Sequence, residues 1–222
     1  MVLLNLVRLF CNKVYCTNFK PFLFKQLKVL KKPINRNYTC AVSGNKLEYN
    51  PECEKKINNQ IAVELGASYT YFQLAFHFNK STVGLKGLRN FFLALSEEEI
   101  EHARYLMYYQ NLRGGKIILT DIKCPENVEW TALKALEKAL DLEIRVTKAI
   151  LDIHQLACRS SDPHLASFLE TEFINEQYSS VRKLRQMLAN LKVSGESEGL
   201  LQIDRELLHK YKPKLLLHPP KK

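Results

Sequence analysis

Apolar residues recur every three or four positions between about residues 50 and 192, which is the spacing of one face of an α-helix. No segment shows the alternation of apolar and polar residues that is typical of a half-buried β-strand. The pattern predicts four long helices and one short helix, over about 52–78, 84–111, 129–158, 162–192 and 200–210. Because an average helix has about 11–12 residues, four helices of this length predict an all-α fold built as a four-helix bundle.

Glycine and proline mark the ends of these helices. Gly114 and Gly115 follow the second helix, where a glycine in the left-handed conformation can end the last turn. Asp162 and Pro163 begin the fourth helix, because Asp caps free backbone amides and Pro suits the first helical position. The segment 114–128 has no helical pattern and is long enough to run the length of the bundle, so we expect one long crossover.

The composition is that of a folded protein with an uneven charge distribution. Of 222 residues, 46% are hydrophobic and 25% charged, and no run of 18 apolar residues occurs, which excludes wholesale disorder and predicts no membrane-spanning helix. Residues 1–47 hold nine Lys and Arg and no Asp or Glu, and 205–222 hold six Lys and Arg and one Glu. Since the net charge is +10, the stretch between them is mildly acidic, which argues against nucleic-acid binding.

The acid-free segment 1–47 predicts a mitochondrial transit peptide, because such peptides are basic and amphipathic. Its first ten residues are mostly apolar around Arg8, and Arg36-Asn37-Tyr38-Thr39 resembles a processing site. Two alternatives stay open: a secretory signal peptide, whose apolar stretch Arg8 would interrupt, and a basic arm that is retained. The six cysteines are scattered without a Cys-x-x-Cys pair, so we expect neither a zinc cage nor a disulfide framework.

Charged residues occupy inward positions near the middle of three predicted helices. Glu64 faces inward on the first helix, Glu99 and His102 on the second, and Glu143 on the third. No Lys or Arg shares these positions, so the carboxylates must protonate, pair or bind a cation. Glu99-x-x-His102 places two ligands on one helix face. With a Glu from each of two other helices, it forms most of a di-iron carboxylate set, whose oxygen and imidazole ligands suit iron.

The fourth helix has no second Glu-x-x-His motif and offers Asn175-Glu176-Gln177 instead. An amide there is a weaker ligand or a hydrogen-bond donor to bound oxygen or water. Simpler interpretations stay open, since a Glu in a predicted seam can reflect an error in helix phase and the acidic run around Glu98 can be a solvated face. Core packing is the simpler role for four aromatic residues and one histidine: Tyr69, Tyr71, Phe72, Phe76 and His154.

Several motifs, in this order, make residues 48–210 resemble a ferritin of the heavy-chain type. They are Ile61-Ala-Val-Glu-Leu-Gly-Ala-Ser-Tyr-Thr-Tyr71, Ser96-Glu-Glu-Glu-Ile-Glu-His-Ala103, Gln110-Asn-Leu-Arg-Gly-Gly115, Asp162-Pro-His-Leu165 and Asn175-Glu-Gln177. The resemblance implies a ferritin-like domain over 48–210 with a short fifth helix. It lies between a basic presequence over 1–47, like that of a mitochondrial ferritin, and a basic tail over 211–222. It also implies a homo-oligomeric cage of twenty-four subunits, which other ferritin subunits could join.

The resemblance further implies that the protein oxidises Fe(II) with dioxygen at a di-iron ferroxidase centre and stores ferric mineral inside the cage. Glu64, Glu99 and His102 would hold the first iron. Glu99 would bridge to the second iron, which Glu143 completes with support from Gln177. Tyr71 matches a tyrosine that hydrogen-bonds a ligand in the family.

The sequence departs from the family pattern at the expected ion channels. Of two acids expected along the threefold channel, Glu170 is kept but Ser167 replaces the other, and Arg104 stands where cavity-facing acids are common. Asp204 and Arg205 alter the short fifth helix. Two alternative functions follow. One is a structural ferritin subunit that co-assembles with an active subunit. The other, less favoured because the second Glu-x-x-His is missing, is a di-iron oxygenase.

Overall fold

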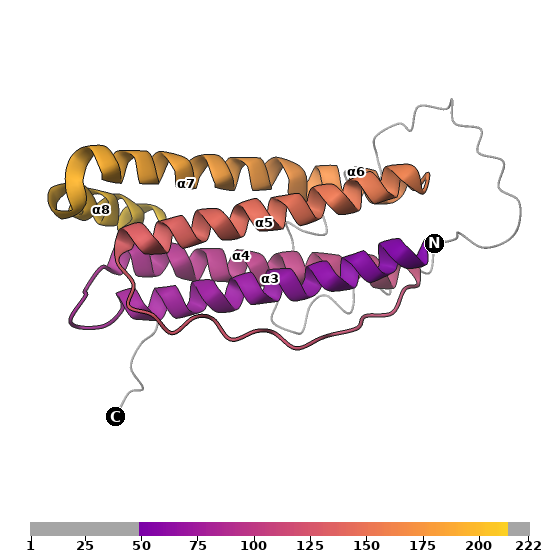
Figure 1. Ribbon diagram of the computed structural model, residues 1–222, viewed down its shortest axis with the longest axis horizontal. Helices are drawn as coiled ribbons and strands as arrows, with labels where there is room; N and C mark the ends of the chain where they lie inside the picture. The colour runs from indigo at the N-terminus through magenta and orange to yellow at the C-terminus, as the bar shows by residue number, and fades with distance from the viewer. Residues whose placement is uncertain (1–48, 213–222) are drawn as a thin grey trace, which may run out of the picture. The chain divides into compact units, whose positions relative to one another are not determined.

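The computed structural model describes residues 49–212, so the predicted transit peptide and nearly all of the basic tail lie outside the described residues. Four long helical stretches run side by side (Figure 1). The helices are α3 (Pro51–Phe78), α4 (Lys86–Arg113), α5 (Ala132–Arg159), α6 (Pro163–Leu169), α7 (Asn175–Ser194) and α8 (Leu200–Lys210). Two π-helical turns, η1 (Glu170–Ile174) and η2 (Gly195–Gly199), join α6 to α7 and α7 to α8. The predicted all-α bundle with a short fifth helix is confirmed.

The segment between α4 and α5 crosses the length of the bundle alongside α3 (Figure 1). Asn58 of α3 donates to the Lys116 carbonyl at 2.9 Å and accepts from the Ile118 amide at 3.0 Å. Further along α3, Gln73 Nε2 donates to the carbonyl of Glu126 at 3.0 Å. The predicted long crossover is therefore confirmed, and it lets α4 and α5 run in the same direction.

Helix ends follow the local signals of the sequence. Asn50 caps α3 by accepting from the Glu52 amide, Thr131 caps α5 and Asp162 caps α6. Gly114 ends α4 with φ 75°, a left-handed conformation that only glycine adopts without strain. None of the helices in residues 49–212 combines the length and apolarity needed to cross a bilayer.

The inward face of α3 includes the predicted Glu64 but only one of the four aromatic residues expected to pack in the core. The buried residues step through Ile57, Ile61, Glu64, Ser68, Tyr71, Ala75 and Phe78. The prediction that Tyr69, Phe72 and Phe76 pack in the core is wrong for the subunit, since their exposed fractions are 48%, 46% and 37%. Tyr71 alone of the four aromatic residues is fully buried. The error arose because α3 is rich in apolar residues on two faces, so the sequence pattern allowed more than one phase.

The π-helical turn η1 changes the inward face of the fourth helical stretch. A π-turn takes up more residues than an α-turn and rotates the residues that follow it. As a result Gln177 and Val181 follow Phe173 as the buried residues. A regular heptad seam would instead place Glu176 and Ser180 inward. Gln177 is 1% exposed, whereas the side chain of Glu176 is 41% exposed.

The core consists of two apolar clusters with a polar layer between them. One cluster includes Leu74, Phe92 and Leu136, and the other includes Ile61, Leu106 and Phe173. Each long helical stretch contributes apolar residues to both clusters, and its buried polar residues near mid-length lie between the two sets. They are Glu64, Ser96, Glu99 and His102, Glu143, and Gln177. This layer is where the predicted metal ligands lie.

Candidate metal centre

The polar layer brings together the residues that the sequence predicted from four separate helical stretches. Each is 0–4% exposed, and they are Glu64 and Tyr71 of α3, Glu99 and His102 of α4, Glu143 of α5 and Gln177 of α7. Glu64, Glu99 and His102 each offer a ligand atom, and these three atoms lie within 4.8 Å of one another. The three side chains therefore form a cluster of the size that one cation can occupy.

Glu64 has one satisfied oxygen and one without a partner. Gln60, one turn earlier on α3, donates from Nε2 to Glu64 Oε1 at 2.8 Å. Glu64 Oε2 is buried and makes no hydrogen bond with any described residue. A buried acceptor without a partner is costly, so this oxygen is available for a ligand that the protein binds.

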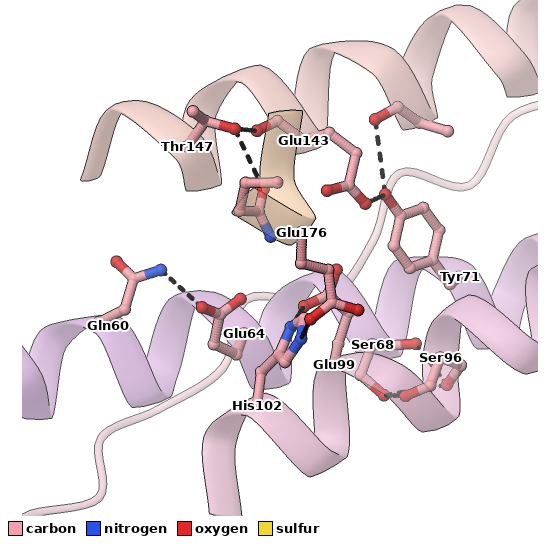
Figure 2. Close-up of polar contacts among 12 residues, drawn as sticks. Gln60, Glu64, Ser68, Tyr71, Ser96, Glu99, His102, Glu143, Thr147 and Glu176 are labelled. Carbon is pink, nitrogen blue, oxygen red and sulfur yellow. Dashed lines mark hydrogen bonds and ion pairs between the residues drawn. The ribbon is translucent and has the colours of Figure 1, made fainter. Parts of the chain in front are cut away.

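His102 lies between two carboxylates, as Figure 2 shows. Its Nδ1 is 3.0 Å from Glu99 Oε2 and its Nε2 is 3.2 Å from Glu176 Oε2. Burial lowers the pKa of His102, but hydrogen bonds to Glu176 and Glu99 outweigh it and raise the pKa to about 11. Without a metal the imidazole is therefore protonated, and it must release a proton before a ring nitrogen can bind a cation.

Glu143 is held on the opposite side of the layer by Tyr71 (Figure 2). The Tyr71 hydroxyl donates to Glu143 Oε1 at 2.6 Å and also lies 3.4 Å from the Ala139 carbonyl. One turn after Glu143, the Thr147 hydroxyl lies 2.7 Å from the Glu143 carbonyl and 3.1 Å from Gln177 Oε1. Glu143 and Gln177 thus line the same layer but lie outside the three-residue cluster.

The layer has an excess of negative charge. Burial raises the pKa of Glu64 and of Glu99, and the charge of Glu99 raises that of Glu64 further. Burial also raises the pKa of Glu143, against the hydrogen bond from Tyr71, which lowers it. Within residues 49–212, the ion pair of Glu99 is with His102. A bound cation would supply the positive charge that these carboxylates lack.

The donor set fits a divalent transition metal. It combines carboxylate oxygens with an imidazole, which suits iron, and it includes the unpartnered Glu64 oxygen. Glu64, Glu99 and His102 can hold a first ion. Glu143 can contribute to a second ion, because it lies close enough to the cluster for the charge of Glu64 to raise the pKa of Glu143 and for the charge of Glu143 to raise the pKa of Glu99. Such a donor set can bind metal ions.

Three contributors were not predicted as site residues. Gln60 orients Glu64, Thr147 contacts Gln177, and Glu176 reaches His102 from α7. Gln60 and Thr147 lie one helical turn from a predicted carboxylate, so the i,i+4 spacing was a usable signal. A regular heptad seam would turn Glu176 inward, but Glu176 reaches the cluster from a side chain that is 41% exposed.

Two residues, Glu98 and His154, have surroundings that differ from the predicted ones. Burial, followed by the hydrogen bond and charge of Glu176, raises the pKa of Glu98 to about 7, so Glu98 is not a simple solvated residue.

The prediction that His154 is an ordinary core residue is wrong, because it is only partly buried and its Nε2 lies 2.7 Å from Glu170 Oε1. Its position near the exposed C-terminal end of α5, facing η1, explains the difference.

Comparison with known proteins identifies close relatives. Residues 54–193 match the family described as Ferritin: Ferritin-like domain. The chain is 45% identical over 169 residues to the soma ferritin of Lymnaea stagnalis, covering 76% of this chain and 97% of that protein. It is 48% identical over 144 residues to the ferritin middle subunit of Salmo salar, covering 64% and 82%. A chloroplastic ferritin of Phaseolus vulgaris is 44% identical over 166 residues, covering 72% and 65%.

Proposed function

The chain belongs to the ferritin family, and from that premise we propose that it is an iron-storage subunit with ferroxidase activity, of the heavy-chain type. It binds Fe(II) at the cluster of Glu64, Glu99 and His102, oxidises it with dioxygen, and deposits the ferric product inside a multi-subunit cage. The observation that carries this proposal is the cluster itself, with three ligand atoms within 4.8 Å and a buried Glu64 oxygen that lacks a partner.

In the proposed reaction, Glu99 bridges two ions, Glu143 and Gln177 complete the second, and Tyr71 holds Glu143 in place through its 2.6 Å hydrogen bond. Two Fe(II) ions give up one electron each, and dioxygen takes up both electrons and two protons to become hydrogen peroxide. The two Fe(III) ions react with four water molecules to form two units of ferric oxyhydroxide and six protons. Two of these protons are those taken up by the peroxide, so four are released to solution. Buried carboxylates favour this direction, because they stabilise the higher charge of Fe(III) more strongly than that of Fe(II).

We also propose that the subunit assembles into a cage of twenty-four copies. The support is the exposed aromatic face of α3, on which Phe72 and Phe76 contact each other with ring centroids 4.7 Å apart. Exposed apolar patches of this kind mark protein interfaces, and a neighbouring copy would cover this one. Sedimentation velocity of the purified protein tests the assembly, and a monomer or dimer at micromolar concentration would contradict it.

For the compartment we propose the mitochondrion, on the basis of the acid-free, basic segment 1–47. A fusion of residues 1–47 to a fluorescent protein should co-localise with a mitochondrial marker. A diffuse cytosolic signal, a secreted product or import into another organelle would each contradict the proposal.

The central experiment is single-turnover oxidation of Fe(II) by the full chain, followed by absorbance of the ferric product after rapid mixing. We expect oxidation well above the rate in buffer, with saturation near two Fe(II) per subunit. One observation favours a second candidate, a structural subunit that co-assembles with an active one: Ser167 stands where the resemblance leads us to expect an acid of the ion route. No acceleration over buffer would leave only that structural role.

A further inference from the structure

Thr147 links the third and fourth helical stretches at the metal layer through its hydroxyl. Thr147 Oγ1 lies 2.7 Å from the Glu143 carbonyl, one turn back on α5, and 3.1 Å from Gln177 Oε1 on α7. Gln177 is 1% exposed, and Thr147 is partly buried. Thr147 therefore connects the backbone carbonyl of one predicted iron ligand, Glu143, to the side chain of another predicted site residue, Gln177.

The chemistry of the two groups decides how the Gln177 amide is oriented. A threonine is stiff about its first side-chain bond, and the contact to the Glu143 carbonyl fixes the hydroxyl further. An amide carries its acceptor oxygen and its two N–H donors on opposite lobes. The one hydroxyl proton of Thr147 is shared between the Glu143 carbonyl and Gln177 Oε1, so Oε1 faces Thr147 and the Nε2 donors point away from it.

We propose that Thr147 is a positioning residue that makes Gln177 serve the iron site as a hydrogen-bond donor through Nε2, and not as an iron ligand through Oε1. This inference rests on the proposed ferroxidase function. It changes the role that the resemblance implies for Gln177, while Glu64, Glu99, His102 and Glu143 keep the roles proposed above.

A fixed donor has a clear use at this position. Negative charge develops on dioxygen as it takes electrons from two Fe(II) ions, and a preorganised N–H group stabilises such charge without having to reorient. The carboxylates of the layer cannot do this, because an ionised carboxylate only accepts hydrogen bonds. The π-turn η1 supports the arrangement, since it rotates α7 so that Gln177 rather than Glu176 is buried in the layer.

The test uses paired substitutions in the full chain. Thr147→Val keeps the shape of the side chain and removes the hydroxyl, whereas Thr147→Ser keeps the hydroxyl. Thr70→Val is the matched control, because the Thr70 hydroxyl makes the same type of bond to a carbonyl four residues earlier, Gly66, at 3.0 Å. Gln177→Leu removes the amide altogether. Each variant is compared by single-turnover Fe(II) oxidation and by calorimetric titration with Zn(II), which binds without undergoing oxidation.

We expect Thr147→Val to slow Fe(II) oxidation about 5-fold, the loss corresponding to one hydrogen bond in the transition state. Thr147→Ser and Thr70→Val should stay within about 2-fold of the unsubstituted protein. The Zn(II) stoichiometry should be unchanged and its affinity should stay within about 2-fold in every variant, including Gln177→Leu, because Gln177 is not a ligand.

Three results would overturn the inference. The first is an unchanged rate of Fe(II) oxidation in Thr147→Val, and the second is an equal loss of rate in Thr147→Val and Thr70→Val. The third is a fall of about 10-fold or more in Zn(II) affinity in Gln177→Leu, which would make Gln177 a ligand. Failure of the proposed ferroxidase function would give a different result, because the unsubstituted protein itself would not accelerate Fe(II) oxidation. The role proposed for Thr147 would then be refuted together with that function.

Discussion

Replacing Glu64 with glutamine separates metal binding from folding. Glu64→Gln keeps the size and shape of the side chain, and it keeps the oxygen that accepts from Gln60 at 2.8 Å. It replaces the buried, unpartnered Oε2 with an amide nitrogen that can donate to the neighbouring Glu99 carboxylate, and it removes the repulsion between Glu64 and Glu99. The substitution should therefore stabilise the metal-free protein while removing an iron ligand.

The magnitude follows from the buried oxygen. An unsatisfied buried polar group costs about 1–3 kcal/mol. For a chain of this size 1 kcal/mol shifts the unfolding temperature by about 2–4 °C, so the metal-free variant should unfold roughly 2–12 °C higher. Loss of a residue that merely orients a metal ligand costs about 10–100-fold, so loss of the ligand itself should slow Fe(II) oxidation by at least about 100-fold.

The assays are differential scanning calorimetry of the metal-free protein and single-turnover Fe(II) oxidation. Glu129→Gln is the control, because it makes the same change of charge at a side chain that is 91% exposed, and it should alter neither quantity. Zn(II) should raise the unfolding temperature of the unsubstituted protein more than that of Glu64→Gln. A variant that oxidises Fe(II) normally, or whose metal-free form unfolds at a lower temperature than the parent, would refute the reasoning.

Three further predictions test the packing and the charges around the site. Tyr71→Phe removes the hydroxyl that donates to Glu143 at 2.6 Å, so we expect the free energy of unfolding at neutral pH to fall by about 1–3 kcal/mol. Chemical denaturation measures this, and an unchanged midpoint would show that the hydrogen bond does not contribute to stability. Gly87→Ala places a Cβ against the backbone of Asp204, so α8 should detach from α4 and become sensitive to proteolysis, and intact resistance would contradict this close contact. Burial lowers the pKa of His164 below its ordinary value of 6.5, so the unfolded chain binds a proton more readily than the folded one. Stability should therefore fall as the pH is lowered through about 6.5, and His164→Gln should weaken that fall; an identical pH profile in the variant would exclude His164 as the cause.

The helices and the ligand types were predictable from the sequence because both are local properties. A helix repeats every 3.6 residues, so a run of apolar residues at steps of three and four marks it without knowledge of its neighbours. Glu99, His102 and Glu143 stood out because a charged residue in an apolar seam contradicts that local pattern. Caps such as Asp162 and the left-handed Gly114 are equally local, and the structure confirms their positions.

Rotation about each helix axis was less predictable. The sequence of α3 allows more than one inward face, and only packing against the other helices shows that Tyr71 is inside while Phe72 is outside. In α7 the π-turn η1 shifts the inward face from Glu176 to Gln177, and nothing in the heptad pattern marks such a turn. Asp204 is a similar case: it accepts from the Leu88 amide at 2.8 Å and so caps α4 from α8, a contact between residues distant in sequence.

The partners of each site oxygen depend entirely on the folded arrangement. That Glu64 has an oxygen without a partner, that Glu176 reaches His102 across the layer, and that Thr147 contacts Gln177 are consequences of how four helices align along and around one another. The periodicity of one helix specifies which of its faces is apolar, but the distance between side chains on two helices depends on the packing of the whole core. For this reason the chain alone reveals an all-α bundle with buried acids, and the tertiary structure decides which of those acids lie within reach of one metal ion.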